Sequence, residues 1–236
     1  MASSNALWRT RNVTLPLVLR GYDLVVANAV SPLLWRCPAS THKVQYKRLV
    51  RGQHLEIGPG SGYYLIESGA ATLARRLTLV DLAEEPLAFA QKKLREAGAR
   101  DCAAFARDIL EPLDLPGDEP FDSCGLNHVL HCVPGPMASK LDRALENLTP
   151  YLADDAAVFG STVLQGSDKG HTAASRAFLR FLNDRHIFYN DHDSIDSMHT
   201  ILNDHFKHVS LRRVGAEAVF EASIPIKRQP LSSETK

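Results

Sequence analysis

The sequence predicts an α/β fold in which a doubly wound, mostly parallel seven-stranded sheet carries helices on both faces. Three observations support this prediction. From Arg51 onward, short apolar runs typical of strands alternate with helical stretches, as in a parallel sheet that is covered on both sides. A glycine-rich stretch follows the first apolar run directly. The last two runs are joined by a tight turn at Gly215, which predicts a C-terminal antiparallel hairpin.

Composition limits the chain to one main domain. Its 236 residues, 44% of them hydrophobic, suffice for one sizeable domain with a full core, whereas a second independent domain would be cramped. Lysine plus arginine and aspartate plus glutamate number 27 each. Because the net charge is near zero, no electrostatic field attracts nucleic acid or an anionic membrane.

The cysteines and the N-terminal residues indicate a cytoplasmic protein. The four cysteines form no C-x-x-C pair, as is typical of reduced thiols inside cells. Residues 1–10 lack the apolar core of a signal peptide, and the apolar segment 13–35 is too interrupted to span a bilayer. We therefore expect a cytoplasmic monomer or homodimer without stable membrane insertion and without a nucleic-acid partner.

The chain begins with a predicted helical extension, residues 1–50. Pro16, Pro32 and Pro38 divide it into two or three short helices. Because these helices precede the first strand, we expect them to lie outside the core of the sheet domain.

The main domain is predicted to cover residues 51–227. Its expected strands are residues 53–57, 77–80, 102–106, 121–127, 156–164, 207–214 and 216–224. Helical patterns between them cover residues 61–70, 82–97 and 137–152. After the fifth strand, a helical insertion is expected at residues 165–205, with one helical face through Phe178 and Phe181 and an irregular part around residues 190–197. A polar tail follows at residues 228–236.

The stretch HLEIGPGSGYY, residues 54–64, carries the strongest signal. Gly58, Gly60 and Gly62 follow the first strand directly. Glycine is needed where φ is positive or where a Cβ would collide with a ligand, so the pattern predicts a backbone cradle at the N-terminus of a helix. The dinucleotide fingerprint would require a further glycine at position 63, which is Tyr63. A glycine-rich turn without a ligand is the alternative.

This G-x-G-x-G pattern, with Glu56 two residues before it, resembles motif I of the class I S-adenosylmethionine-dependent methyltransferases. The resemblance implies that the loop wraps the methionine and ribose portions of S-adenosylmethionine. Residues 54–64 contain no lysine or arginine, which agrees with a cofactor that carries a sulfonium and an ammonium. The implied cofactor-binding residues of this loop are Glu56, Gly58, Pro59, Gly60 and Gly62.

Two acids extend the predicted cofactor site. Asp81, followed by Leu82, ends the second strand about twenty residues past the loop, where open α/β sheets place an acid on ribose hydroxyls. Its alternative role is to cap the next helix. Asp108 resembles the family's acid that receives the adenine amino group, with Ile109 flanking the ring; a solvated loop acid is the alternative.

The segment FDSCGLNHVLHCVPG, residues 121–135, resembles the F-D-x-x-x-x-x-x-x-L-H segment of methyltransferases of ubiquinone and menaquinone biosynthesis. The resemblance places Asn127 and His128 at the cofactor. His131 and His128 are candidate general bases, because histidine titrates near neutral pH, and structural or positioning roles are the alternative. Family extensions often cover the cofactor, which makes Tyr22 a further catalytic candidate.

Other residues suggest a lid over the site, and no residue pattern predicts a metal. Tyr22, Asp23 and Trp35 are candidate lid residues, although the extension could also pack for stability alone. Histidines and aspartates gather in residues 169–208 without a spacing typical of zinc, so no metal is predicted. Cys132 is interpreted as a small thiol that lines the pocket.

The resemblance implies methyl transfer from S-adenosylmethionine to a small organic metabolite, with secondary metabolism as one setting. The acceptor atom is left open between oxygen, nitrogen, sulfur and carbon. No N-P-P-Y segment follows the fourth strand, and an apolar or aromatic acceptor is expected between the extension and residues 178–189. One alternative is a protein of this fold that binds cofactor or ligand without methyl transfer; another is a methyltransferase that acts on protein side chains.

Overall fold

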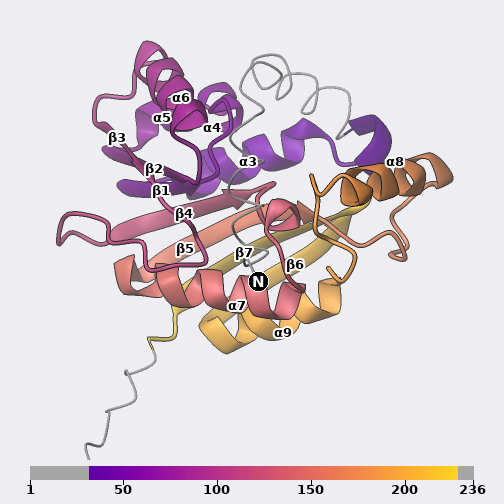
Figure 1. The fold of residues 1–236 in the computed structure, drawn as a ribbon. Helices are drawn as coiled ribbons and strands as arrows, with labels where there is room; N and C mark the ends of the chain where they lie inside the picture. The colour runs from indigo at the N-terminus through magenta and orange to yellow at the C-terminus, as the bar shows by residue number, and fades with distance from the viewer. Residues whose placement is uncertain (1–31, 228–236) are drawn as a thin grey trace, which may run out of the picture.

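A seven-stranded sheet in the order β3-β2-β1-β4-β5-β7-β6 organises residues 32–227, the part of the chain that the computed structural model describes (Figure 1). The strands are β1 (Gln53–Ile57), β2 (Arg76–Asp81), β3 (Cys102–Ala106), β4 (Phe121–Asn127), β5 (Leu152–Val163), β6 (Phe206–Val214) and β7 (Glu217–Pro225). β1 to β5 pair in parallel, and β7 runs antiparallel to both β5 and β6. The predicted sheet with its C-terminal antiparallel strands is confirmed.

The strand order fixes where a ligand can bind. The chain builds β1, β2 and β3 outward in one direction and then returns to place β4 on the other side of β1. Open α/β sheets bind ligands outside the carboxyl ends of the strands at this point of reversal. The ends of β1 and β4 carry the glycine loop and Asn127, respectively.

Two layers of helices enclose the sheet (Figure 1). One layer contains α3 (Ala39–Leu49), α4 (Tyr63–Glu67), α5 (Ala70–Leu73) and α6 (Glu84–Glu96), and the other contains α7 (Met137–Leu148) and α9 (Ile195–His205). α8 (Ala173–Asp184) packs through Leu179 and Leu182 against Val163 at the end of β5. Two short 3₁₀ helices, η2 (Leu130–Cys132) and η3 (Thr149–Tyr151), flank α7. None of the helices in residues 32–227 has the length and apolar character needed to cross a bilayer.

Alternation along the central strands explains the two layers. In β1, Leu55 and Ile57 pack in the cluster that contains α7 and α9. The intervening Glu56 faces α3, where the Tyr46 hydroxyl donates to its carboxylate. All of β1 is buried, as expected for a parallel strand covered on both faces.

The structure corrects three details of the predicted elements. α3 packs Tyr46 and Val50 into the core, so the expectation that the extension helices lie outside the core is wrong for this helix. The helix predicted over residues 61–70 is two short helices that are broken at Gly69, whose φ is +76°. α9 is regular from Ile195 and is capped by the Ser194 side chain, so the irregular part ends earlier than predicted.

Candidate active site

The glycine loop follows β1 as an irregular turn. Gly58, Gly60 and Gly62 have φ values of +64°, +55° and +77°, a region that favours glycine because it lacks a Cβ. Gly58 N–H donates to Val80 O at 2.8 Å, which ties the loop to β2. A Cβ on Gly58 would lie 2.6 Å from Val129 Cγ2. Substitution there would therefore press the loop against the segment that follows β4.

Glu56 lies beneath this loop rather than at the surface, because it is only 2% exposed. Its Oε1 accepts from the Tyr46 hydroxyl, and its Oε2 lies 2.9 Å from His54 Nε2. His54 Nδ1 in turn lies 2.9 Å from Ser123 Oγ. The carboxylate thus links α3, β1 and β4, and a direct contact between Glu56 and the cofactor stays a prediction.

Asp81 ends β2 half-buried, and its Oδ1 accepts from the Ala83 N–H at 3.1 Å. Ala83 is the N-cap residue of α6, and this helix start has no side-chain capping hydrogen bond, so the alternative role of Asp81 as a helix cap also stays a prediction. Leu82 packs at the margin of the main core. A contact of Asp81 or Leu82 with the cofactor stays a prediction.

Asp108 follows β3 half-buried, and its Oδ1 accepts from the Leu110 N–H at 3.0 Å. Ile109 is buried in the core cluster that contains α7. The carboxyl end of β3 therefore brings Asp108 to the expected edge of the sheet, while the proposed contact of Ile109 with a ring stays a prediction.

Asn127, the last residue of β4, carries an unsatisfied donor. Its Oδ1 accepts from the Ser161 hydroxyl, whereas its Nδ2 has no partner among the described residues. A buried amide N–H without an acceptor is costly. A ligand with a hydroxyl or carboxylate oxygen at this position would satisfy it, which fits the predicted cofactor.

His131 is buried, and its hydrogen-bond partners determine which ring nitrogen carries the hydrogen. The Val163 N–H donates to His131 Nδ1 at 3.2 Å, so the neutral ring carries its hydrogen on Nε2. Burial, followed by the effect of His128, lowers the pKa of the His131 imidazole well below its usual range. His131 is therefore suited to donate a hydrogen bond from Nε2 and poorly suited to accept a proton.

His128 faces a carboxylate that the sequence analysis did not identify. Its Nε2 lies 3.0 Å from Glu217 Oε2, on β7. His128 has a φ of +58°, a strained conformation for a residue with a Cβ that is common at functional sites. Burial raises the pKa of the Glu217 carboxyl. The charge and hydrogen bonds of His128 and His42 lower it by more, so that the pKa lies well below its usual range.

Two more side chains complete the cluster around Glu217. His42 Nε2 lies 3.3 Å from Glu217 Oε2 and 3.5 Å from Cys37 Sγ. The donor atoms of Cys37, His42 and Glu217 lie within 4.8 Å of one another, a set that a metal ion could share. We interpret the cluster as a site of proton transfer, because two imidazoles of different elements point at one carboxylate oxygen. The predicted absence of a metal stays a prediction.

Aromatic rings also pack next to His131. The Phe188 ring centroid is 4.2 Å from that of His131. Trp35 contacts Phe178 and Phe188 with centroid separations of 6.0 and 6.3 Å. We call Trp35, Phe178 and Phe188 the aromatic wall. Residues Tyr22 and Asp23 lie outside the described residues, so their predicted roles stay predictions.

Cys132 is half-buried and packs beside the aromatic wall. Burial, followed by the effect of Asp81, raises the pKa of its thiol to about 12. The thiol is therefore protonated at neutral pH and is a weak nucleophile, while its pocket-lining role stays a prediction.

The sequence identified residues that lie within the motifs, such as His128. It did not identify their partners far along the chain, such as Glu217. Glu217 is 89 positions from His128, and no local motif marks it. Its signal is an acid at the start of a strand whose other central residues, such as Val219 and Phe220, are apolar and buried. Such a pattern indicates a buried carboxylate that requires partners.

Comparisons with known proteins agree with this geometry. Residues 55–158 match a family model described as a methyltransferase domain. The chain is 36% identical to the physcion biosynthesis cluster O-methyltransferase of Aspergillus chevalieri, over 89% of this chain and 92% of that relative. It is 32% identical to the demethylluteothin O-methyltransferase of Streptomyces thioluteus, over 85% of each chain.

Among solved structures, the fold is similar to that of the N-methyltransferase NodS from Bradyrhizobium japonicum WM9 in complex with S-adenosyl-L-homocysteine. The TM-score is 0.57 at 16% sequence identity, and the likeness covers 80% of this chain and 88% of that chain. At this identity the likeness concerns the fold.

Proposed function

The chain belongs to the class I S-adenosylmethionine-dependent methyltransferases, and on that premise we propose that it methylates a hydroxyl group on a small aromatic molecule. The observation that carries this proposal is the contact of 3.0 Å between His128 Nε2 and Glu217 Oε2. A hydroxyl oxygen attacks a methyl group well only when its proton is removed, and this pair can remove it.

The tautomer of His128 supports the proposed base. When Nε2–H donates to the Glu217 carboxylate, Nδ1 of the neutral ring has no hydrogen and can accept the hydroxyl proton. The imidazolium that forms is stabilised by the buried negative charge of Glu217. The proton thus passes from the acceptor oxygen to His128 Nδ1, and the methyl group would move from the sulfonium sulfur to that oxygen, so that the sulfur would leave as a neutral thioether.

The cofactor cradle fits S-adenosylmethionine in its chemistry. We propose that the loop of Gly58, Gly60 and Gly62 holds it through backbone contact, with Asp81 on hydroxyls and Asn127 Nδ2 donating to an oxygen. When bound, S-adenosylmethionine supplies a methyl group that its positive sulfur has already activated for displacement. Asp108 is the proposed acceptor for the adenine amino group.

His131 and the aromatic wall are proposed to orient the acceptor. His131 carries its hydrogen on Nε2, as the contact of Nδ1 with Val163 indicates, so it can donate to the acceptor oxygen. Phe188 packs against His131 and Trp35 packs against Phe188, so the proposed acceptor ring would add to this aromatic packing. The names of two relatives, both O-methyltransferases, support oxygen as the acceptor atom.

A transfer assay with isotopically labelled methyl tests the proposal. Planar phenols, their amine counterparts and their methyl ethers are incubated with the protein and labelled S-adenosylmethionine. We expect label on the phenols and none on the matched ethers, which lack the hydroxyl proton. Label confined to the amines would contradict oxygen as the acceptor. Tight cofactor binding without transfer to any compound would instead support a binding protein of this fold.

A further inference from the structure

Residues 186–193 lie between α8 and α9, contact the carboxyl end of β5 and carry Phe188 of the aromatic wall. This segment has no regular secondary structure, yet Phe188, Asn190 and Asp193 are buried. The Tyr189 N–H donates to the backbone oxygen of His131 at 2.7 Å. The segment is thus bonded directly to the residue whose ring Phe188 covers.

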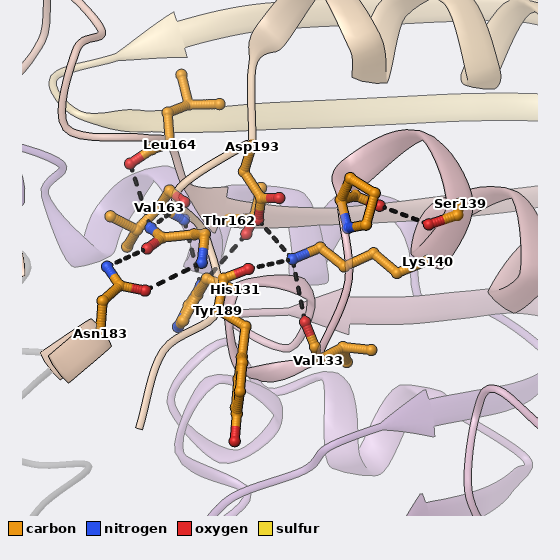
Figure 2. A network of polar contacts seen from close by, with 12 residues as sticks. His131, Val133, Ser139, Lys140, Thr162, Val163, Leu164, Asn183, Tyr189 and Asp193 are labelled. Carbon is orange, nitrogen blue, oxygen red and sulfur yellow. Dashed lines mark hydrogen bonds and ion pairs between the residues drawn. The ribbon is translucent and has the colours of Figure 1, made fainter. Parts of the chain in front are cut away.

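Lys140 holds the middle and the end of the segment (Figure 2). It lies on α7, and its side chain is fully buried. Its Nζ donates to Val133 O at 3.1 Å and to Tyr189 O at 3.0 Å, and it lies 2.7 Å from Asp193 Oδ2. One ammonium therefore joins η2, α7 and residues 186–193 in a fixed geometry.

A second buried side chain fixes the same segment from the side of β5. Asn190 Nδ2 donates to Val163 O at 2.9 Å, and its Oδ1 accepts from Asn183 Nδ2 at 2.9 Å. The Val163 N–H is the group that donates to His131 Nδ1. Val163 therefore supports both the segment and His131 (Figure 2).

A buried ion pair is a poor way to stabilise a fold. Taking two charges out of water costs several kcal/mol for each ion, and well-packed apolar replacements often stabilise as much or more. What Lys140 supplies and an apolar residue cannot is direction, because its three contacts point at three separate backbone and side-chain oxygens.

We propose that Lys140 is a positioning residue for methyl transfer, which sets the acceptor side of the site by holding Phe188 against His131. This inference rests on the proposed function, since it takes the aromatic wall as the acceptor surface. It assigns no chemical step to Lys140, which has no contact with the glycine loop in the described residues.

The decisive variant is the pair Lys140→Met and Asp193→Asn, which leaves neither partner as an unpaired buried charge. We expect it to fold and to bind S-adenosylmethionine with unchanged affinity in calorimetry. Its kcat/KM for the acceptor should fall by up to about 100-fold, because a shift of about 1 Å in the acceptor position has an effect of this size. Asp142→Asn is the matched control, since it removes the charge from a contact of 2.7 Å between α7 and His205 without touching the segment.

A double-mutant cycle with Phe188→Ala separates positioning from general stability. If Lys140 acts through Phe188, the paired substitution should add no further loss of kcat/KM in the Phe188→Ala background. Additive losses, or unchanged kcat/KM in the paired variant, would overturn the proposal. A purely structural role predicts equal losses in cofactor affinity and in acceptor turnover.

Hydrogen exchange provides a readout that needs no acceptor. The amide of Tyr189 should lose protection in the paired variant and keep it in Asp142→Asn. The cycle itself can be run with whichever acceptor receives label, so that failure of hydroxyl methylation does not imply failure of the positioning role. Unchanged protection of Tyr189 would contradict the inference even if phenol methylation is confirmed.

Discussion

One carboxylate oxygen of Glu217 lies within 3.0 Å of His128 Nε2 and within 3.3 Å of His42 Nε2. Because the site is buried, the charge of Glu217 acts at short range with little screening by water. His128 is the partner that reaches the carboxyl end of β4, so it is the proposed base, whereas His42 keeps the carboxylate in position from α3.

His128→Gln is expected to reduce kcat for a phenolic acceptor by about 10²- to 10⁴-fold, the usual contribution of a general base. Glu217→Gln should reduce kcat less, because the ring of His128 remains but its charged partner is lost. The measurement is steady-state kinetics, with cofactor affinity from calorimetry as the control. The two effects should be non-additive when combined, because both residues serve one proton transfer. Wild-type kcat in His128→Gln would rule out this base.

Among individual residues, the sequence could identify His128, His131 and the glycines, because they belong to local motifs. It could not show which of the two histidines is better placed to accept the proton. The decisive facts are that Val163 N–H occupies Nδ1 of His131 and that Glu217 faces His128. Both depend on the register between strands that are far apart in the chain.

Among the elements, the glycine loop offers a test with a matched control. Gly60→Val should weaken S-adenosylmethionine binding at least about tenfold, or about 1.4 kcal/mol, because a side chain would separate the backbone from the ligand. The strain of a positive φ, about 1–2 kcal/mol for a residue with a Cβ, would also lower the free energy of unfolding.

Gly69→Val carries the same strain without the contact. Gly69 has a φ of +76°, and a Cβ there would meet nothing within 4 Å. We expect both variants to lose similar stability in chemical denaturation and only Gly60→Val to lose cofactor affinity in calorimetry. Equal affinity in the two variants would mean that the loop does not approach the cofactor closely.

The observed strands and helices show which sequence patterns predict element boundaries. β1, β3 and β4 begin and end where the apolar runs predict, because a buried parallel strand is a short continuous apolar run. The start of α9 at Ile195 was missed because the preceding residues are polar, and the signal is the side chain of Ser194 as a cap. The break at Gly69 was missed because glycine also occurs within helices.

Across the whole molecule, buried imidazoles make stability depend on pH. Burial lowers the pKa of the His131 and His42 imidazoles below 6.5. Below about pH 6.5 the unfolded chain takes up protons that the folded chain does not. The free energy of unfolding should therefore fall on acidification, by about 1.4 kcal/mol per pH unit for each such histidine.

Chemical denaturation between pH 7 and pH 5 tests this dependence. His131→Asn keeps an acceptor for the Val163 N–H but cannot titrate, so the decline in stability with falling pH should be shallower. His192→Asn, at an exposed position, is the control and is expected to leave the slope unchanged. A slope in His131→Asn equal to that of the wild type would show that His131 does not contribute.

The overall architecture was predictable because alternating strands and helices permit few topologies. The proposed acceptor side could not be predicted in this way. It is assembled from Trp35 before the sheet, Phe178 on α8 and Phe188 in an irregular segment. No periodicity relates these positions, and only the packing around Val163 and Ala216 brings them together.

β7, which carries Glu217, follows all five parallel strands in the chain although it lies beside β5 in the sheet. On a translating ribosome, Glu217 is therefore added 89 residues after His128. At about 5–20 residues per second, this interval lasts roughly 4–18 seconds. A nascent chain in which the glycine loop is complete therefore still lacks the carboxylate that faces the proposed base.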